Sequence, residues 1–562
     1  MTSSPTEPMR SRLAALAAPL FAVAAISLAA AGAATGAWAQ STSTTGSGVQ
    51  VGTLGDATPD YAGTLEEGGG GFPMDMWKGT DRALVEQLLP KLPPALGSPA
   101  MRDLERRLLL TNAESPEGKS TGVSLFAARA DRLAAMGFSR DAASLLAMMP
   151  ARLVDKTAAR LRLDSLLLAG DLDGACKAVD DTRQAASADP YWQQAQVFCQ
   201  IRAGKADQAA LGLDLLGEQG GKDSAFFKLA SALGGEKVKL DSLPDPTPLD
   251  LAMLRAAKLP LPHDAAQSHN PGVLAVLAQD RSLDAAARLA AAEEAAATGG
   301  LTIDQLQEAY TSVSFPPGGL DDPIAAAAKD PGPMGRALLY QATGTKADLQ
   351  ARARLLQAAL AGAQHRGGYL LAEQVNMTYL LPIAPSADLA WFAGDAGRAL
   401  YVAGHYEQAN AWLELIQGGA RDAAAASGLA VYAQIAGVGP AASRDPAWRF
   451  PVVAGKEGAE RLMAVFEGLG QPVGAGAMLG QAQASAGAVP AADPALLFSL
   501  SDAAAAHRIG ETVLLSLYAL GPEGPGGCNP LALARVVAGL RQIGFDSEAR
   551  AIAIEAAVAA GV

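Results

Sequence analysis

The clearest signal for the fold lies between Val123 and Met149, where the chain reads VSLFAARADRLAAMGFSRDAASLLAMM. Apolar residues recur at helical spacing on both sides of Gly137, and Ala142 follows this glycine by five residues. Glycine adopts the left-handed backbone conformation that commonly ends a helix without steric cost. The stretch therefore predicts two helices, over 123–136 and 141–149, joined by a tight turn.

Five further glycines stand in similar surroundings, each after a helix-like run and each followed five residues later by alanine or, once, by leucine. They are Gly170, Gly204, Gly404, Gly510 and Gly544. Successive steps from Gly137 to Gly170 and Gly204 span 33 and 34 residues, and Gly544 follows Gly510 by 34 residues. A fixed period near 34 is typical of stacked helix–turn–helix units. Such stacks form extended binding surfaces.

The composition favours helices throughout the chain. Half of the 562 residues are hydrophobic but only 5% are aromatic, and alanine supplies much of the apolar content. Alanine has the highest helix propensity, whereas sheets favour β-branched and aromatic residues. We therefore expect an all-α, TPR-like α-solenoid, because a chain of this length exceeds one compact core. The expected parts are helical repeats over 72–233, an irregular Pro-rich helical middle over 234–332, further repeats over 333–436 and C-terminal helical repeats over 437–562.

The N-terminus has the features of an export signal. Arg10 and Arg12 precede an apolar run rich in small residues, and Ala37-Trp38-Ala39 supplies a small-x-small cleavage pattern. We expect a signal peptide over 1–39, cleavage after Ala39 and a periplasmic product without a membrane span. The alternative is a retained signal that anchors the protein, since the apolar run approaches the length of a membrane span.

Residues 40–71 are rich in serine, threonine and glycine and end in four glycines, so a flexible linker is expected there. The segment from Phe72 to Trp77 follows it. We expect this segment to cap the first helices of the folded body, and the alternative is a short linear motif for a partner.

The segment from Trp391 to Ile416 resembles a tetratricopeptide (TPR) repeat. With Gly404 as the turn glycine, Gly397 takes the place of the glycine in the family's first helix, and Ala409 that of the alanine in its second helix. Leu413 then stands at the large apolar position four residues later. The resemblance implies stacked helix pairs, and together with the export signal it indicates an exported bacterial protein with TPR-like repeats.

The net charge of the chain restricts the class of partner. The net charge is −13, and removal of residues 1–39, which carry Glu7, Arg10 and Arg12, makes it about −14. Nucleic-acid affinity depends on lysine and arginine neutralising phosphates, so a nucleic-acid partner is not expected.

In an oxidising compartment Cys176 and Cys199, on adjacent predicted helices, are candidates for a disulfide, and two buried thiols are the alternative. Cys528 is left as a free or intermolecular thiol.

A search for catalytic motifs finds only weak candidates. Gly118-Lys119-Ser120 ends like a phosphate-binding loop but lacks its first glycine. His263 and His269 lie close in sequence without a third metal ligand nearby. Glu114-Ser115 resembles the catalytic pair of soluble lytic transglycosylases, whose helical superhelix is architecturally similar, but stands in a polar loop. No catalytic residue, cofactor or metal is expected.

The expected function is therefore a non-catalytic periplasmic scaffold that binds protein or peptide partners of the cell envelope in a concave groove. Seven polar or aromatic residues on the predicted first helices are candidate groove contacts: Arg129, Arg160, Gln193, Gln196, Asn376, Trp391 and Arg398. The alternative is a peptidoglycan-related enzyme or accessory with a lytic-transglycosylase-like superhelix. A structural protein of the envelope is a third class.

Overall fold

The computed structural model describes residues 59–93, 97–149, 154–182, 189–218, 225–316, 318, 320–364, 368–417, 423–438, 450–471, 473 and 493–562. The chain divides into two units, Met1–Ala57 and Thr58–Val562, and all described residues belong to the second. The expected signal peptide over 1–39 and residues 40–58 of the expected linker lie outside the described residues.

Every regular element within these described ranges is a helix, which confirms the all-α fold. The N-terminal helices, in chain order, are η1 (Pro59–Tyr61), η2 (Glu67–Gly69), α1 (Arg82–Leu88), η3 (Leu89–Lys91), α2 (Pro99–Leu110), α3 (Leu125–Ala135), α4 (Ser139–Ala147), α5 (Lys156–Ala169), α6 (Leu172–Thr182), α7 (Pro190–Arg202), α8 (Ala206–Glu218) and α9 (Ala225–Leu233). The Pro-rich middle holds α10 (Pro248–Ala256), η5 (His263–Gln267), α11 (Pro271–Leu277), α12 (Ala285–Thr298), α13 (Ile303–Thr311) and α14 (Pro323–Lys329).

The remaining helices continue to the C-terminus. They are α15 (Pro333–Thr345), α16 (Leu349–Gln364), α17 (Tyr369–Leu380), η6 (Ala387–Phe392), α18 (Ala393–Val402), α19 (Tyr406–Gln417), α20 (Ala423–Ala436), α21 (Phe450–Gly468), α23 (Pro494–Ala505), α24 (Ile509–Leu520), α25 (Gly524–Gly527), α26 (Pro530–Gln542) and α27 (Asp546–Ala559). Prolines at helix starts and aspartate, serine, threonine or asparagine caps account for many of these boundaries, because proline lacks a donor that the first turn does not need.

Five of the six expected turn glycines do end a helix in the left-handed conformation: Gly137, Gly170, Gly204, Gly404 and Gly544 have φ between 70° and 89°. The alanine five residues after each of them is buried, and these alanines are Ala142, Ala175, Ala209, Ala409 and Ala549. A methyl group at this position lets the second helix of each pair pack closely against the first. The period in the sequence thus reflects a repeated packing contact.

The sixth turn was predicted at the wrong residue. Gly510 lies inside α24, and the residue that takes a positive φ, of 54°, before this helix is His507. Gly510 instead provides space for an indole, because a Cβ at this position would lie 2.6 Å from the Trp77 ring. A glycine can thus mark a close approach between elements rather than a turn.

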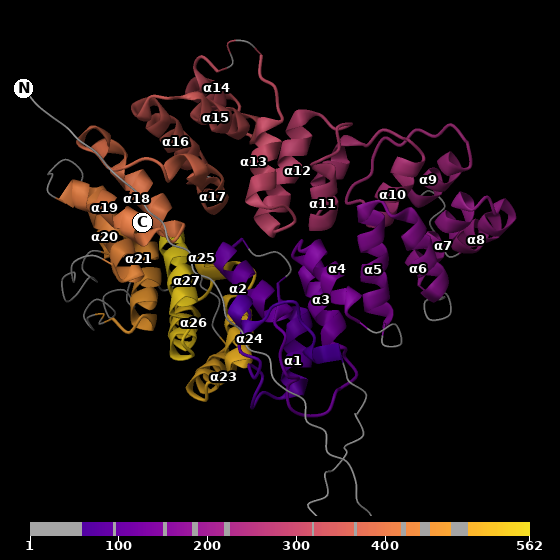
Figure 1. Ribbon diagram of the computed structural model, residues 1–562, viewed down its shortest axis with the longest axis horizontal. Coiled ribbons are helices and arrows are strands. Elements are labelled where there is room, and N and C mark those ends of the chain that lie inside the picture. The colour runs from indigo at the N-terminus through magenta and orange to yellow at the C-terminus, as the bar shows by residue number, and fades with distance from the viewer. Residues whose placement is uncertain are drawn as a thin grey trace, which may run out of the picture. The chain divides into compact units, whose positions relative to one another are not determined.

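Consecutive helices pack in pairs, as expected for stacked units: α3 with α4, α5 with α6, α7 with α8, and α18 with α19. Other contacts join elements that are far apart in the sequence. Helix α2 packs against α24 and α27, and α11 packs against α3 and α5. Figure 1 shows the indigo helices α1 and α2 beside the yellow C-terminal helices. In a one-dimensional repeat stack each unit contacts only its neighbours, so the solenoid arrangement and the TPR type of the repeats stay predictions.

The segment before α1 is ordered against the end of α2. The expectation of a flexible linker is therefore wrong for residues 59–71. Backbone bonds hold them against the end of α2, including Thr64 N to Leu110 O at 2.9 Å. The buried guanidinium of Arg82 also binds the carboxylate of Asp60 at 2.5 Å. Glycine-rich composition did not reveal this order because the stabilising groups belong to other parts of the chain.

In the segment Phe72–Trp77 the side chains of Phe72, Met76 and Trp77 are buried, and the segment docks on the C-terminal helices as well as on the first ones. The Phe72 ring lies 5.0 Å from the Phe545 ring, centroid to centroid. The backbone N–H of Gly510 donates to the carbonyl oxygen of Met76 at 2.8 Å. The two ends of the described unit are therefore held together by this short segment.

Candidate functional site

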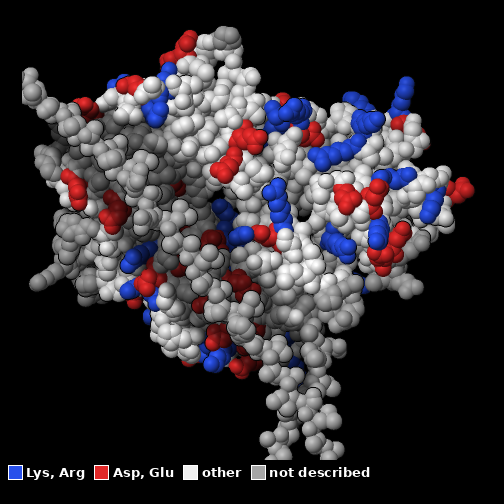
Figure 2. All heavy atoms as spheres, in the orientation of Figure 1, with Lys and Arg blue, Asp and Glu red and all other residues white. Residues whose placement is uncertain are grey.

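A cavity of about 950 Å³ lies where helices from distant parts of the chain meet, and we call it the larger cavity. Its walls come from α2, the α3–α4 turn, α5, α10, α11, the α12–α13 turn and α17. Ligand pockets in proteins typically enclose roughly 300–1,000 Å³. Figure 2 shows basic side chains around a hollow in the middle of this face, between α2, α4 and α13 as labelled in Figure 1.

Glycines let the walls of the larger cavity converge. A Cβ on Gly137 would lie 2.5 Å from the backbone nitrogen of Gly300, and one on Gly300 would lie 2.8 Å from the carbonyl oxygen of Pro271. A Cβ on Gly272 would lie 2.9 Å from a methyl of Leu168. Backbone thus touches backbone where the α3–α4 turn, the start of α11 and the α12–α13 turn meet, which only glycine permits at these distances.

Four arginines and two aspartates line the larger cavity. Arg106 pairs with Asp141 at 2.6 Å and lies over the Phe138 ring. The lining residue Arg255 contacts Asp280 at the longer distance of 3.7 Å. Arg140 is exposed and has no ion pair among the described residues. The lining therefore carries more positive than negative charge, in a chain that is acidic overall.

The fourth arginine, Arg102 of α2, is mostly buried. Its guanidinium donates to the carbonyl oxygen of Ala297 in α12. Burial lowers the pKa of Arg102, and the nearby charge of Glu555 opposes this shift. Arg102 thus joins α2 to α12 at the edge of the cavity.

A second cavity of about 370 Å³, the smaller cavity, shares Pro99, Arg102 and Gln374 with the larger one. Its walls come from α2, α12, α13, α15, α16 and α17. Gln374 is half-buried, and its side chain makes no hydrogen bond to another described residue. The two cavities therefore form adjoining spaces with an amide at their boundary.

A polar network holds one wall of the smaller cavity. The Tyr310 hydroxyl donates to the Glu293 carboxylate at 2.6 Å, and Arg336 Nε donates to the same oxygen at 2.7 Å. Burial, together with the charge of Glu293, raises the pKa of Tyr310 well above its ordinary value. The hydroxyl therefore stays protonated and keeps α13, α12 and α15 in register.

No family model matches this chain. No curated protein matches it either. Within the described part of the chain, no helix combines the length and apolar character needed to cross a bilayer. The same residues contain no group of three or more histidine, cysteine, aspartate or glutamate side chains placed to hold a metal ion.

Of the seven predicted groove residues, Asn376 lines the smaller cavity and the other six line neither cavity. Asn376 is buried, and its Nδ2 donates to the carbonyl oxygen of Ala372 at 2.8 Å. Its Oδ1 accepts no hydrogen bond from the described residues. The other residues lie on α3, α5, α7, η6 and α18, and a groove shared by these helices stays a prediction.

Arg129 is wrong as a groove residue, because its guanidinium is buried and binds four backbone carbonyls. It donates to Leu109 O at 2.6 Å, Ala62 O at 2.8 Å, Asp60 O at 3.0 Å and Thr111 O at 3.0 Å. Burial lowers the pKa of Arg129 to about 10. Arg129 therefore secures the segment before α1, and four of its five N–H donors are used within the protein.

Two of the other groove candidates have polar groups that bind neighbouring side chains of the protein. Arg160 pairs with Asp164 at 3.0 Å and lies over the Tyr191 ring, and the Trp391 indole N–H donates to Gln350 Oε1 at 3.1 Å. Gln193 and Gln196 on α7 and Arg398 on α18 are half-buried.

The weak catalytic candidates lie on the surface. Glu114 is exposed, and Ser120 donates its hydroxyl proton to Glu86 at 2.9 Å, which ties its loop to α1. His263 and His269 are exposed and contact single aspartates. In the part of the chain that the structure describes, these residues lie in loops or at the start of a helix.

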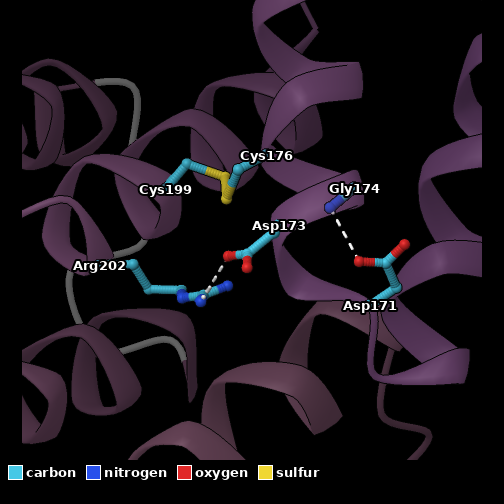
Figure 3. The surroundings of a disulfide bond; sticks show 6 residues. All are labelled: Asp171, Asp173, Gly174, Cys176, Cys199 and Arg202. Atoms are coloured by element: carbon cyan, nitrogen blue, oxygen red, sulfur yellow. Dashed lines mark hydrogen bonds and ion pairs between the residues drawn. A yellow bond between two sulfur atoms is a disulfide. The ribbon is translucent and has the colours of Figure 1, made fainter.

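The candidate cysteines form a disulfide between α6 and α7 (Figure 3), and the Cα atoms of Cys176 and Cys199 are 5.5 Å apart. Arg202 pairs with Asp173 at 3.0 Å beside it, across the same two helices. Cys528 is a free, buried thiol, and burial raises its pKa to about 11.

The arginines of the larger cavity and Gln374 were not predicted from the sequence. A signal existed in the glycines: Gly299-Gly300 and Gly272 stand in a stretch that was expected only to form an irregular middle. Glycines that are not needed for turns can mark close backbone contacts. Which elements they bring together is not readable from the sequence.

Proposed function

We propose that this chain is an exported, non-catalytic scaffold of the cell envelope that binds a peptide segment of a protein partner in its cavities. The supporting observation is the larger cavity, which seven distant parts of the chain enclose with guanidinium, amide and apolar side chains. Periplasmic location rests on the apolar N-terminal run and the Ala37-Trp38-Ala39 pattern.

A peptide suits this lining better than a glycan. Glycan sites favour aromatic stacking surfaces, and the linings of the two cavities contain only the aromatic residues Phe138 and Tyr310. Peptides carry both donors and acceptors, which match glutamine amides such as Gln305 and Gln374. The peptidoglycan alternative also loses its candidate acid, since Glu114 lies in an exposed loop outside the cavities.

Site-specific photocrosslinking in cells tests this function. A photoreactive amino acid at Gln305, which lines the larger cavity, should capture a partner, and mass spectrometry should map the adduct to one peptide segment. The matched position is Arg535, exposed on α26 and outside both cavities, where this adduct should be absent. Equal capture at both positions, or none at Gln305, would contradict the proposal. The same sample tests export, because the mature protein should begin at Gln40.

A further inference from the structure

The lining of the larger cavity has an excess of positive charge, whereas the chain as a whole is negatively charged. Acidic residues exceed basic ones by 13 in the whole sequence, yet the lining of this cavity has four arginines and two aspartates. A cleft lined mainly by one sign of charge focuses the electric field and attracts ligands of the opposite sign. The lining is therefore suited to a negatively charged ligand.

The protein's own carboxylates leave part of this charge uncompensated. The short Arg106–Asp141 contact at 2.6 Å accounts for one lining aspartate, and Asp103 lies 3.5 Å from Arg107, which is outside the lining. Arg255 is at 3.7 Å from Asp280, and Arg140 pairs with no described carboxylate. Arg140 and Arg255 come from α4 and α10, so a ligand in the cavity meets guanidinium groups from two separate elements.

The ligand also meets an unused amide. Gln374 stands at the boundary of the two cavities and offers a donor and an acceptor in the arrangement that a peptide bond matches. Apolar residues, among them Leu168, Val276 and Ile303, cover other parts of the wall. This combination fits a chain with carboxylates, amides and aliphatic groups better than it fits an inorganic anion.

We propose that the ligand of the larger cavity is a short acidic peptide segment, whose carboxylates pair with Arg140 and Arg255 and whose backbone amide bonds to Gln374. This inference rests on the proposed function and narrows it to one chemical class. Arginine is suited to the role because its planar fork binds a carboxylate through two parallel hydrogen bonds.

Titration calorimetry on the purified protein tests the inference with three pentapeptides. The first has glutamates at its second and fourth positions and a free C-terminal carboxyl group. The second has glutamines at those positions and an amidated C-terminus, and the third has lysines. We expect the acidic peptide to bind at least about tenfold more tightly than the others, because charge-assisted hydrogen bonds are the strong ones.

Variants assign the binding to the cavity. Arg140→Gln and Arg255→Gln should each weaken binding of the acidic peptide about tenfold, since each loses a hydrogen bond to a charged group. Arg535→Gln, on an exposed arginine of α26, should leave the affinity unchanged. Thermal melting of all variants should match that of the parent protein, which separates loss of binding from loss of fold.

The outcomes distinguish the inference from the proposed function. Equal affinity for the acidic and neutral peptides, or tighter binding of the lysine peptide, would overturn the acidic class while leaving peptide binding in place. Unchanged affinity in both arginine variants would overturn the assignment to this cavity. If none of the three peptides binds, the acidic class is overturned, and the photocrosslinking at Gln305 then decides the proposed function separately.

Discussion

Trp77 and Gly510 form a contact on which the junction between the two ends of the described unit depends. The indole of Trp77 is 7% exposed and lies against the backbone of Gly510 at the start of α24. A side chain at position 510 has no room, because the nearest indole atom would lie 2.6 Å from its Cβ. Adding one methyl group at position 510 therefore tests how much this junction contributes to the stability of the protein.

Gly510→Ala should lower the free energy of unfolding by about 1–3 kcal/mol, as expected for overpacking. The matched control is Gly428→Ala inside α20, where a Cβ would make an ordinary contact of 3.6 Å with Val562. This control should be neutral or stabilising, since alanine has the higher helix propensity. Urea denaturation of both variants measures the difference, and equal stabilities would contradict the expected crowding.

Cys528 should be chemically inert in the folded protein. Its thiol is buried, burial raises its pKa to about 11, and it contacts the carbonyl oxygen of Pro525. Since the thiolate is the reactive form, iodoacetamide at pH 8 should not label the native protein and should label it at one site after unfolding. Rapid labelling of the native protein at Cys528, located by mass spectrometry, would show that this site opens.

At the scale of elements, five helix pairs have a small buried residue at a fixed distance from their turn. Ala142 and Ala409 are 1% and 0% exposed. Gly397 in α18 has a related role, but a Cβ there would lie 2.6 Å from Leu429 of α20, rather than against the helix that follows α18 directly. Small residues thus serve contacts between pairs as well as within them.

The disulfide between α6 and α7 should stabilise the helix pairs α5–α6 and α7–α8 against each other. Removing it with Cys176→Ala and Cys199→Ala should lower the free energy of unfolding by about 3 kcal/mol, because the open chain regains loop entropy. Hydrogen exchange should rise first in α6 and α7. Cys528→Ala serves as the control for loss of a cysteine without loss of a bridge, and a double variant as stable as the parent would contradict the expected loss.

At the scale of the whole molecule, α2 and α27 meet through a buried carboxylate. Glu555 accepts hydrogen bonds from the Ala100 backbone N–H at 2.8 Å and from the Ser98 hydroxyl, and it feels the positive charge of Arg102. Burial raises the pKa of Glu555 to about 7. Burial and the charge of Glu555 raise the pKa of Glu373 in α17 to about 8.

Stability should therefore fall as the pH rises from about 6 to 9. Both glutamates have an ordinary pKa of 4.5 and a higher one in the folded protein. Their contribution is fully present below 4.5 and is lost as the pH passes through 7 and 8, because the folded state binds more protons than the unfolded state. Urea denaturation at pH 6, 7.5 and 9 measures this trend.

Glu373→Gln should flatten the pH dependence and raise stability at pH 9 by about 1 kcal/mol or more, since one pKa unit corresponds to about 1.4 kcal/mol. Glu308→Gln, on an exposed glutamate of α13, should change neither the slope nor the stability. A free energy of unfolding that rises between pH 6 and 9 in the parent protein would contradict the assigned direction.

Local patterns in the sequence were enough to predict the all-α class, the helix pair around Gly137 and five of the six turns. Helix propensity, proline and capping residues act within a few neighbouring positions, and these are visible in a linear chain. It also pointed to the pair Cys176 and Cys199, which lie on consecutive helices. Such features depend on local chemistry alone.

Contacts between distant elements, which create the candidate site, follow from the three-dimensional packing of the helices. Arg129 and residues 59–71 were misjudged because carbonyls and carboxylates from other segments satisfy or order them. Arg140 and Arg255 are more than 100 residues apart in the sequence and face one cavity because Gly137, Gly272 and Gly300 let three turns converge. Contacts between remote segments leave no periodic pattern in the sequence. They therefore become visible only in the three-dimensional arrangement of the helices.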